Sequence, residues 1–478
     1  MFAAPALFHS RPRNPNILWL MTDEHRPDSL RCYGSPWAYS PNLDALAASG
    51  VLFERAYTPS PVCVAARCAL LTGYYGSTTG VLHNEAKLPA DTRFLTWPFE
   101  RAGYATASFG KKHYFLAGRH QAFETEQGMT AGDVVTPEAY GKGYNPAAYD
   151  AVQYPDAPTA RLRRRWILAG KFPAPISATP EEQNVDLAIK WLQGHHPSRP
   201  FFLRLSLNAP HTPVVVPRQF LRYIDSARID LPIAEERDLA GAPARVRVLL
   251  RDFEGAQRLT PGELRKARHY YYARVAFADF EIGRLLTWMR SRGLLDNTII
   301  AMLADHGTDL GDHGLLQKQS FYEQVVTVPY LLCWNGLGRK GVRVKAPVNT
   351  ISLLPTIMNL AGIVSPSIEA FPVRLDGSQD RSADAPVFSE IQYGYQKYRD
   401  DQRQVMIRNG RLKMSLFMER GQSGAHASDP DGELYDLNQD PLERHNLFNQ
   451  PAFADMIARL KANIVDWDRR REVAGKTS

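Results

Sequence analysis

Four short apolar runs recur along the first two thirds of the chain, and each is followed by polar residues. The runs cover residues 16–21, 104–109, 201–207 and 298–304. The run at 16–21 is continuous, which predicts a strand that is buried on both faces of a parallel sheet, and the other three are further strand candidates. Helical patterns lie between the runs, for example at 41–48, 181–192 and 264–290. The alternation predicts a doubly wound α/β fold with a mostly parallel sheet.

The polar residues after these runs carry the candidate chemistry. They occupy positions 22–26, 110–113, 208–211 and 305–307. Open α/β sheets bind their ligands at the carboxyl ends of the strands, so parallel strands would bring all four groups to one rim. Any single group could be a solvated loop. Four groups at equivalent positions predict one shared site.

The pattern changes near residue 378. An amphipathic helix is expected at about 453–469, and it is preceded by short strand-like pieces between Gly, Asp and Asn turns at 387–391, 404–407, 412–417 and 433–435. We therefore expect a large α/β domain over residues 1–377 and a smaller α+β domain, with an antiparallel sheet and a terminal helix, over 378–478. Segments 115–179 and 213–260 interrupt the first domain, and we expect them to form the wall that faces a substrate.

Composition narrows the class of protein. The 478 residues are 44% hydrophobic and 22% charged, with a formal charge of +7, which fits anionic partners. No nucleic-acid motif accompanies the charge, and no apolar run reaches membrane-spanning length, so neither nucleic acid nor a membrane is an expected partner. The first residues carry no basic segment ahead of an apolar one, and the four cysteines form no disulfide framework, which predicts a cytoplasmic location. The sequence does not indicate an oligomeric state.

The most distinctive motif is Cys63-Val-Ala-Ala-Arg67-Cys-Ala-Leu-Leu-Thr-Gly73, which follows a proline-rich turn. It predicts a helix that begins at Cys63 and is capped by Gly73. A side chain at the first position meets unpaired N–H groups and the positive end of the helix dipole. Arg67 lies four residues on, on the same helical face. This arrangement suits an anionic nucleophile or an anionic substrate.

Cys63 has three interpretations. It is a buried, inert thiol, or the nucleophile of a thiolate phosphatase, or a cysteine that is oxidised after translation to give a different nucleophile. A thiolate phosphatase needs an arginine six residues after the cysteine, and that position holds Ala69, so the second interpretation fails.

The motif resembles the signature of the type I sulfatases, Cys-x-Pro/Ala-x-Arg followed by Leu-Thr-Gly. The resemblance extends over almost the whole chain, through the Asp-His-Gly block at 305–307 to Glu-Leu-Tyr-Asp-Leu at 433–437. It implies an alkaline-phosphatase-like fold and counts Cys63 and Arg67 among the catalytic residues. It also implies that a formylglycine-generating enzyme converts Cys63 into formylglycine, whose hydrated aldehyde is the nucleophile.

Two acidic pairs suggest a metal site. Asp23 and Glu24 follow one strand, Asp305 and His306 follow another, and carboxylates are the ligands that hard divalent cations prefer. A single aspartate at such a position more often caps the next helix. The resemblance implies that these four residues and an oxygen of modified Cys63 hold a divalent cation: Ca²⁺ first, with Mg²⁺ or Mn²⁺ as alternatives. Sulfatases usually carry Asp or Gln at the position of Glu24 and often Asn at that of His306, so the metal stays open.

The resemblance assigns roles to five more residues. Lys111 and Lys318 would bind the sulfate from opposite sides, and His113 would bind the hydrated aldehyde. His211, held between prolines, would meet the leaving oxygen as a general acid. Asn84 matches a position near the sulfate, although a turn asparagine explains it equally well.

The function implied is a sulfuric ester hydrolase that uses a divalent metal and releases inorganic sulfate from a small or oligomeric organic sulfate ester. Aryl, sugar and choline-type esters all remain open, and the basic run at 161–165 is a candidate for recruiting a polyanion. The alternative is a phosphonate monoester or phosphodiester hydrolase of the same superfamily. Lys111 and His113 favour the sulfatase, because the phosphonate and phosphodiester hydrolases tend to carry hydroxyl residues at these two positions. A non-catalytic anion-binding protein is disfavoured by the complete set of acid, nucleophile and cation positions.

Overall fold

A mostly parallel sheet forms the centre of the molecule. The computed structural model describes residues 14–116, 121–128, 149–153, 167–232, 242–250, 255–375, 385–392, 403–418 and 432–475. Within these residues the main sheet has eight strands in the order β13-β2-β12-β10-β1-β8-β4-β5. Its middle strands run parallel and confirm the four predicted strands; they are β10 (Thr298–Ala304), β1 (Asn16–Asp23), β8 (Phe201–Pro210) and β4 (Ala105–Gly110).

The outer strands make the sheet mixed. β5 (Thr125–Gln127) is parallel to β4 at one edge, whereas β12 (Tyr330–Cys333) is antiparallel to β10 on the other side. β2 (Val51–Phe53) and β13 (Val342–Val344) complete that side. The predicted fold class, a doubly wound and mostly parallel sheet, is confirmed.

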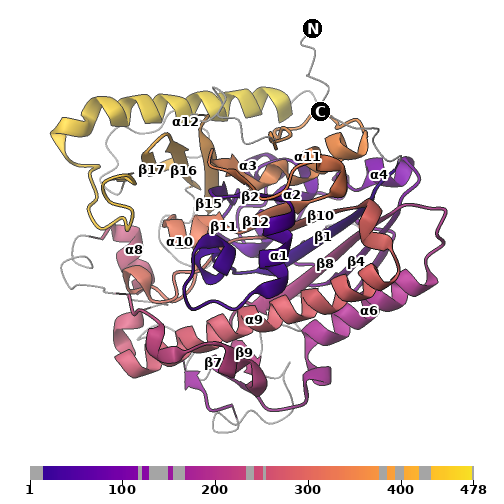
Figure 1. Cartoon of the computed structure of the whole chain (residues 1–478). Helices are drawn as coiled ribbons and strands as arrows, with labels where there is room; N and C mark the ends of the chain where they lie inside the picture. The colour runs from indigo at the N-terminus through magenta and orange to yellow at the C-terminus, as the bar shows by residue number, and fades with distance from the viewer. Residues whose placement is uncertain are drawn as a thin grey trace.

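Helices cover both faces of the sheet (Figure 1). Alternate residues of β1 explain this: Leu18 and Leu20 belong to the apolar cluster shared with α1 (Pro41–Ser49), α6 (Pro180–Gly194) and α9 (Pro261–Ser291). Their neighbours in β1 belong to the cluster shared with α2 (Cys63–Thr72), α4 (Trp97–Arg101) and α11 (Leu353–Ala361). Successive side chains of a strand point to opposite faces, so a continuous apolar run is what a doubly covered strand requires.

Local residues fix where α9 begins. Thr260 accepts a hydrogen bond from the backbone of Glu263, whose side chain accepts one from the backbone of Thr260, and Pro261 occupies the first helical position. This capping box satisfies two backbone N–H groups that a helix start otherwise leaves unpaired.

A buried glutamate on α9, Glu281, makes the free energy of unfolding depend on pH. Burial, reinforced by Glu182 and Glu181 and opposed by Arg284, raises the pKa of Glu281 to about 7. Because this pKa lies above that of the unfolded chain, the stabilising contribution is fully present below about pH 4.5 and is lost as the pH rises through 7. We therefore expect the free energy of unfolding of the wild type to fall by about 2–3 kcal/mol between pH 5 and pH 8 because of this group. Glu281→Gln should not show this fall.

Chemical denaturation of both proteins at several pH values measures this difference. Glu85→Gln is the matched control, because the Glu85 side chain is 47% exposed. Parallel pH profiles for wild type and Glu281→Gln would contradict the prediction.

A second, antiparallel sheet follows near the C-terminus. Its four strands confirm the predicted ones, in the order β15 (Val387–Gln392), β16 (Arg403–Asn409), β17 (Leu412–Met418) and β18 (Glu433–Asp436). The helix α12 (Ala454–Gly475) lies over this sheet (Figure 1). The Trp467 ring stacks on Phe388 with the ring centres 4.4 Å apart. The cluster beneath also contains Ala69 of α2 and Tyr75, so the small sheet shares apolar contacts with the main body. The boundary between residues 377 and 378 falls outside the described residues and stays a prediction.

The two interrupting segments are only partly described. Within them β6 (Val152–Gln153), β7 (Ile167–Phe172) and β9 (Val214–Pro217) form a three-stranded sheet that the sequence pattern did not predict. The basic run at 161–165 lies outside the described residues. The remaining short strands and α-helices of the described residues are β3 (Ala56–Tyr57), β11 (Thr327–Val328), β14 (Val348–Asn349), α3 (Gly76–Thr79), α8 (Ala244–Leu249) and α10 (Glu323–Val326). No helix in the described ranges combines the length and the apolar character needed to cross a membrane.

Candidate active site

The carboxyl ends of the four parallel strands meet at one rim of the sheet, as predicted. Asp23 is the last residue of β1, Asp305 follows β10, and Lys111 follows β4. His211 follows β8. Charged side chains from segments far apart in sequence therefore gather at one place.

Helix α2 points its first residue into this place. It spans Cys63–Thr72 and ends at Gly73, whose φ of 76° is the left-handed conformation expected of a glycine cap. Cys63 has no exposed surface. Its Sγ lies 3.0 Å from Nε2 of His306 and 3.7 Å from Oδ1 of Asp23. The predicted position of Cys63 at a helix N-terminus is confirmed.

Arg67 connects the two predicted acids from the second turn of α2. Its Nη2 donates to Oδ2 of Asp23 at 2.7 Å and its Nε donates to Oδ2 of Asp305 at 2.8 Å. Its Nη1 donates to Oγ of Ser206 on β8 at 2.8 Å. All three charged side chains are fully buried, so the guanidinium offsets two carboxylates that are removed from water.

Lys111 adds a second cation, with its Nζ 2.7 Å from Oδ2 of Asp23. Burial alone would raise the pKa of Asp23, but Lys111, His211, Arg67 and Lys318 together hold it well below its usual value. The Asp23 carboxylate is therefore ionised at neutral pH and available as a ligand or a hydrogen-bond acceptor.

Among the residues that the structure describes, two overlapping groups of donor atoms are compact enough to hold a cation. One consists of Asp23, Cys63, Asp305 and His306, whose ligand atoms lie within 4.8 Å of one another, and all four residues are buried. The other consists of Asp23, Glu24 and His211. The structure thus brings the predicted ligands together but places Glu24 beside His211 rather than in the four-residue group.

The orientation of His306 fits a ligand. Its Nδ1 donates to the carbonyl oxygen of Gly307 at 2.8 Å, which leaves Nε2 to face Cys63. A second hydrogen bond of this kind fixes the ring of most metal-binding histidines. Burial opposes protonation, but Asp305 and Cys63 raise the pKa of His306 to about 9. A cation would have to displace that proton.

Lys318 and His211 face the cysteine from the other side. Nζ of Lys318 lies 3.2 Å from Sγ of Cys63, 3.2 Å from Oε2 of Glu24 and 2.8 Å from Nε2 of His211. Nδ1 of His211 donates to the carbonyl oxygen of Thr212. Burial and the charges of Lys111 and Lys318 lower the pKa of His211 well below its usual value, so its Nε2 accepts the bond from Lys318.

Two predicted residues lie at the edge of this group. Asn84 accepts a hydrogen bond from the backbone N–H of Val64 at 3.1 Å, so it caps the start of α2. His113 is 8% exposed, has a φ of 50°, and packs edge to face on Phe115 at 5.9 Å. Burial and the neighbouring Lys111 lower its pKa well below the usual value.

Sequence reasoning missed three polar residues here. Ser206 binds Arg67, while Thr212 donates to Oε2 of Glu24 at 3.4 Å and accepts from Gln317 at 3.1 Å. Ser206 was detectable as a polar residue inside an apolar strand that leads to the site. Nothing local in the sequence distinguishes Thr212 or Gln317.

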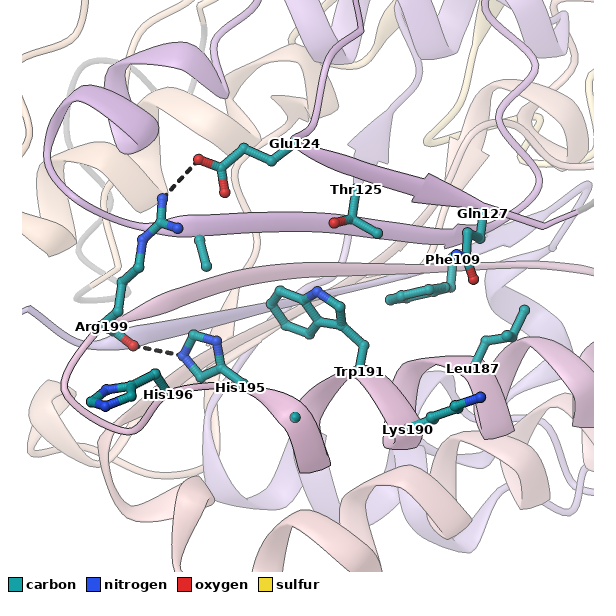
Figure 2. A pocket seen from close by; sticks show the side chains of 12 residues that line it. Phe109, Glu124, Thr125, Gln127, Leu187, Lys190, Trp191, His195, His196 and Arg199 are labelled. Carbon is teal, nitrogen blue, oxygen red and sulfur yellow. Dashed lines mark hydrogen bonds and ion pairs between the residues drawn. The ribbon is translucent and has the colours of Figure 1, made fainter.

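A separate hollow of about 530 Å³ lies between β5 and α6 and contains none of the predicted residues. Figure 2 shows Trp191 and Phe109 at its centre and an ion pair between Arg199 and Glu124 at one end. Nη2 of Arg199 lies 2.7 Å from Oε1 of Glu124. His195 Nε2 donates to the carbonyl oxygen of Arg199 at 2.6 Å. These polar groups bind each other at the end of the hollow that lies away from the predicted site residues.

The doubly wound, mostly parallel sheet with a charged cluster at its carboxyl rim places the protein among the α/β proteins that bind their ligands at the ends of the strands. The chain belongs to the sulfatase family: the family model "Sulfatase" matches residues 15–363, and the model "N-sulphoglucosamine sulphohydrolase, C-terminal" matches residues 311–470. The protein is therefore a sulfatase, an enzyme that hydrolyses sulfate esters. The predicted family, activity and class of substrate, an organic sulfate ester, are confirmed, and the family implies a divalent metal and a formylglycine.

Sequence similarity to known proteins extends over nearly the whole chain. The arylsulfatase of Clostridium perfringens is 26% identical over 476 residues, which cover 94% of this chain and 94% of the relative. The ulvan-active sulfatase of Formosa agariphila is 28% identical over 463 residues, 95% of this chain and 81% of the relative. The crystal structure of the phosphonate monoester hydrolase of Agrobacterium radiobacter superposes with a TM-score of 0.79 at 21% identity, covering 96% of each chain. At that identity the structural likeness shows the fold alone.

Proposed function

We propose that residue 63, converted into formylglycine by a formylglycine-generating enzyme, is the nucleophile of this sulfatase. The observation that carries the proposal is the position of Cys63. The residue begins α2, and its side chain lies among those of Asp23, Asp305, His306 and Lys318. In modified form the residue would supply a nucleophilic oxygen, and a bound divalent cation would polarise the sulfuryl oxygens. The helix N-terminus and Lys318 stabilise negative charge at the same point.

We further propose that Asp23, Asp305, His306 and residue 63 hold the metal, with Glu24 next to them. The donor chemistry supports this proposal, because two carboxylates, an imidazole nitrogen and an oxygen at position 63 suit a hard or borderline cation. Arg67 holds one oxygen of each carboxylate and so orients the other. Ca²⁺ is the proposed ion.

The remaining side chains have separate proposed tasks. Lys111 and Lys318 bind sulfate oxygens, with Asn84 beside them at the start of α2. His211 is proposed to pass a proton to the leaving alcohol oxygen; its Nε2 accepts a hydrogen bond from Lys318 in this structure and would take up that proton when the anionic substrate binds. His113 holds the oxygen at residue 63 by a hydrogen bond. The segments at 115–179 and 213–260 are proposed to select among aryl, sugar and choline-type esters.

Turnover of matched substrates tests the choice between sulfate and phosphonate. We expect kcat/KM for an aryl sulfate to exceed that for an aryl phosphonate monoester by more than about tenfold, a difference of about 1.4 kcal/mol in activation free energy. Both assays use one protein preparation and the same phenol as leaving group. A preference for the phosphonate would overturn the assignment.

Metal removal tests the cation site by stability as well as by activity. We expect a chelator to lower the unfolding temperature and abolish turnover, and Ca²⁺ at about 100 times its dissociation constant to restore about 2.7 kcal/mol of stability. Mg²⁺ and Mn²⁺ are compared at equal concentration, and Asp305→Asn should no longer respond to Ca²⁺. Stronger stabilisation by Mg²⁺ or Mn²⁺ would refute Ca²⁺, and no response to any ion would refute the site.

A further inference from the structure

His113 has a backbone conformation that costs free energy. Its φ of 50° lies in the left-handed region, which residues with a Cβ rarely adopt. Strain of this kind persists only where the surroundings enforce it, and it concentrates at functional sites. Here the two chain neighbours of His113, Lys112 and Tyr114, bind the same carboxylate. The backbone between them is therefore held at both sides of His113.

That carboxylate belongs to Glu126 on the edge strand β5. Oε2 of Glu126 lies 2.8 Å from Nζ of Lys112, and Oε1 accepts a hydrogen bond from the hydroxyl of Tyr114. Oε1 also accepts from the backbone N–H groups of Ala122 and Phe123 at 3.1 and 3.2 Å. The side chain is only 3% exposed, so these charge-assisted bonds replace the water that an ionised carboxylate would otherwise require.

The geometry of the sheet directs Glu126 to this side. Thr125 and Gln127 line the hollow between β5 and α6 (Figure 2), and alternate residues of a strand point to opposite faces. Glu126 lies opposite Ser108 of β4, close to the point where β4 ends and the segment with Lys111 and His113 begins.

Packing contacts fix the ring of Tyr114. Its ring packs edge to face on Phe94 at 5.9 Å, and the guanidinium of Arg204 lies 5.6 Å from its centre. Arg204 is fully buried and also lies 5.0 Å from the ring of Phe123. The hydroxyl therefore reaches Glu126 from a ring whose position packing has already fixed.

We propose that Glu126 is a positioning residue for the sulfatase reaction: by binding both Lys112 and Tyr114, it keeps His113 in its left-handed conformation and aims its imidazole at residue 63. The inference rests on the role given to His113 under the proposed function. Glu126 does not contact the reacting atoms itself, so its effect on the reaction passes through His113.

The test is Glu126→Gln, which keeps the shape of the side chain but removes the charge that binds Lys112. We expect kcat for an aryl sulfate to fall about tenfold while KM changes less than threefold, since misplacement by about 1 Å of a group that acts in the transition state affects mainly kcat. The unfolding temperature should stay near that of the wild type. Glu124→Gln, two residues away and on the surface, is the matched control and should retain wild-type kcat.

A double-mutant cycle separates positioning from an independent effect. If Glu126 acts through His113, Glu126→Gln should cost nothing further in a His113→Ala background. Multiplicative losses, or a fall in stability with unchanged kcat, would overturn the proposal. A wild-type kcat for His113→Ala would instead overturn the role of His113 in the proposed function, and with it this inference. Tyr114→Phe, which lacks only the hydroxyl, should show the same selective fall in kcat and serves if Glu126→Gln does not fold.

Discussion

Replacement of Cys63 by alanine is expected to abolish sulfate ester hydrolysis, with a fall in kcat of more than about 10³-fold, the scale on which removal of a nucleophile acts. The fold should survive. The thiol is fully buried, but its loss removes a single heavy atom, which costs about 1 kcal/mol. Steady-state kinetics and a denaturation curve on the same preparation measure both effects.

Cys68→Ala is the matched control. Cys68 lies on the same helix and is also buried, so its replacement makes a similar cavity away from the charged cluster. It should leave kcat unchanged. The mass of the peptide across Cys63 in the wild type should show that the thiol has been replaced by an aldehyde. Turnover by Cys63→Ala at the wild-type rate would remove the basis of the proposed mechanism.

Arg67→Leu is expected to affect folding and catalysis together. The substitution leaves Asp23 and Asp305 buried without the guanidinium that binds both. Breaking a buried ion pair by removing one partner costs about 3–5 kcal/mol, and a bound cation would recover part of that cost. Activity should fall as well, because neither carboxylate is then oriented.

Denaturation with and without added Ca²⁺ measures the effect of Arg67→Leu. Arg67→Lys keeps the charge but not the fork that reaches both acids, so it should restore only part of the stability. The exposed Arg218→Leu is the control and should change the free energy of unfolding by less than about 0.5 kcal/mol. A loss below about 1 kcal/mol for Arg67→Leu would show that the cluster does not depend on this arginine.

The framework of the site was predictable because its determinants are local. Each of the four parallel strands is a short, mostly apolar run, and the charged and polar residues of the site follow at its carboxyl end. The helix at Cys63 was equally readable, since a turn precedes it and a glycine cap ends it. The resemblance to sulfatases then named the residues, and the structure brings most of them together.

The contacts that orient these residues were not predictable, because each joins segments far apart in sequence. The side chain of Glu24 binds Lys318 and approaches Thr212, and this arrangement is invisible in the string Thr-Asp-Glu-His. Glu126 reads as an ordinary polar residue of a short edge strand. Its importance depends on Tyr114 and Lys112 reaching it across the sheet edge. Distant partners of this kind are fixed by packing rather than by local pattern.

The apolar cluster that Ala69 and Tyr75 share with the small sheet has a consequence for protein engineering. Ala69 lies on the helix that carries Cys63, and the same cluster contains side chains from beyond residue 385, among them Phe388 and Val405. The C-terminal portion is therefore not an exchangeable module. A chimera that borrows it from a relative must also inherit the matching surface of the helix, or the helix that carries Cys63 will pack against side chains that do not fit it.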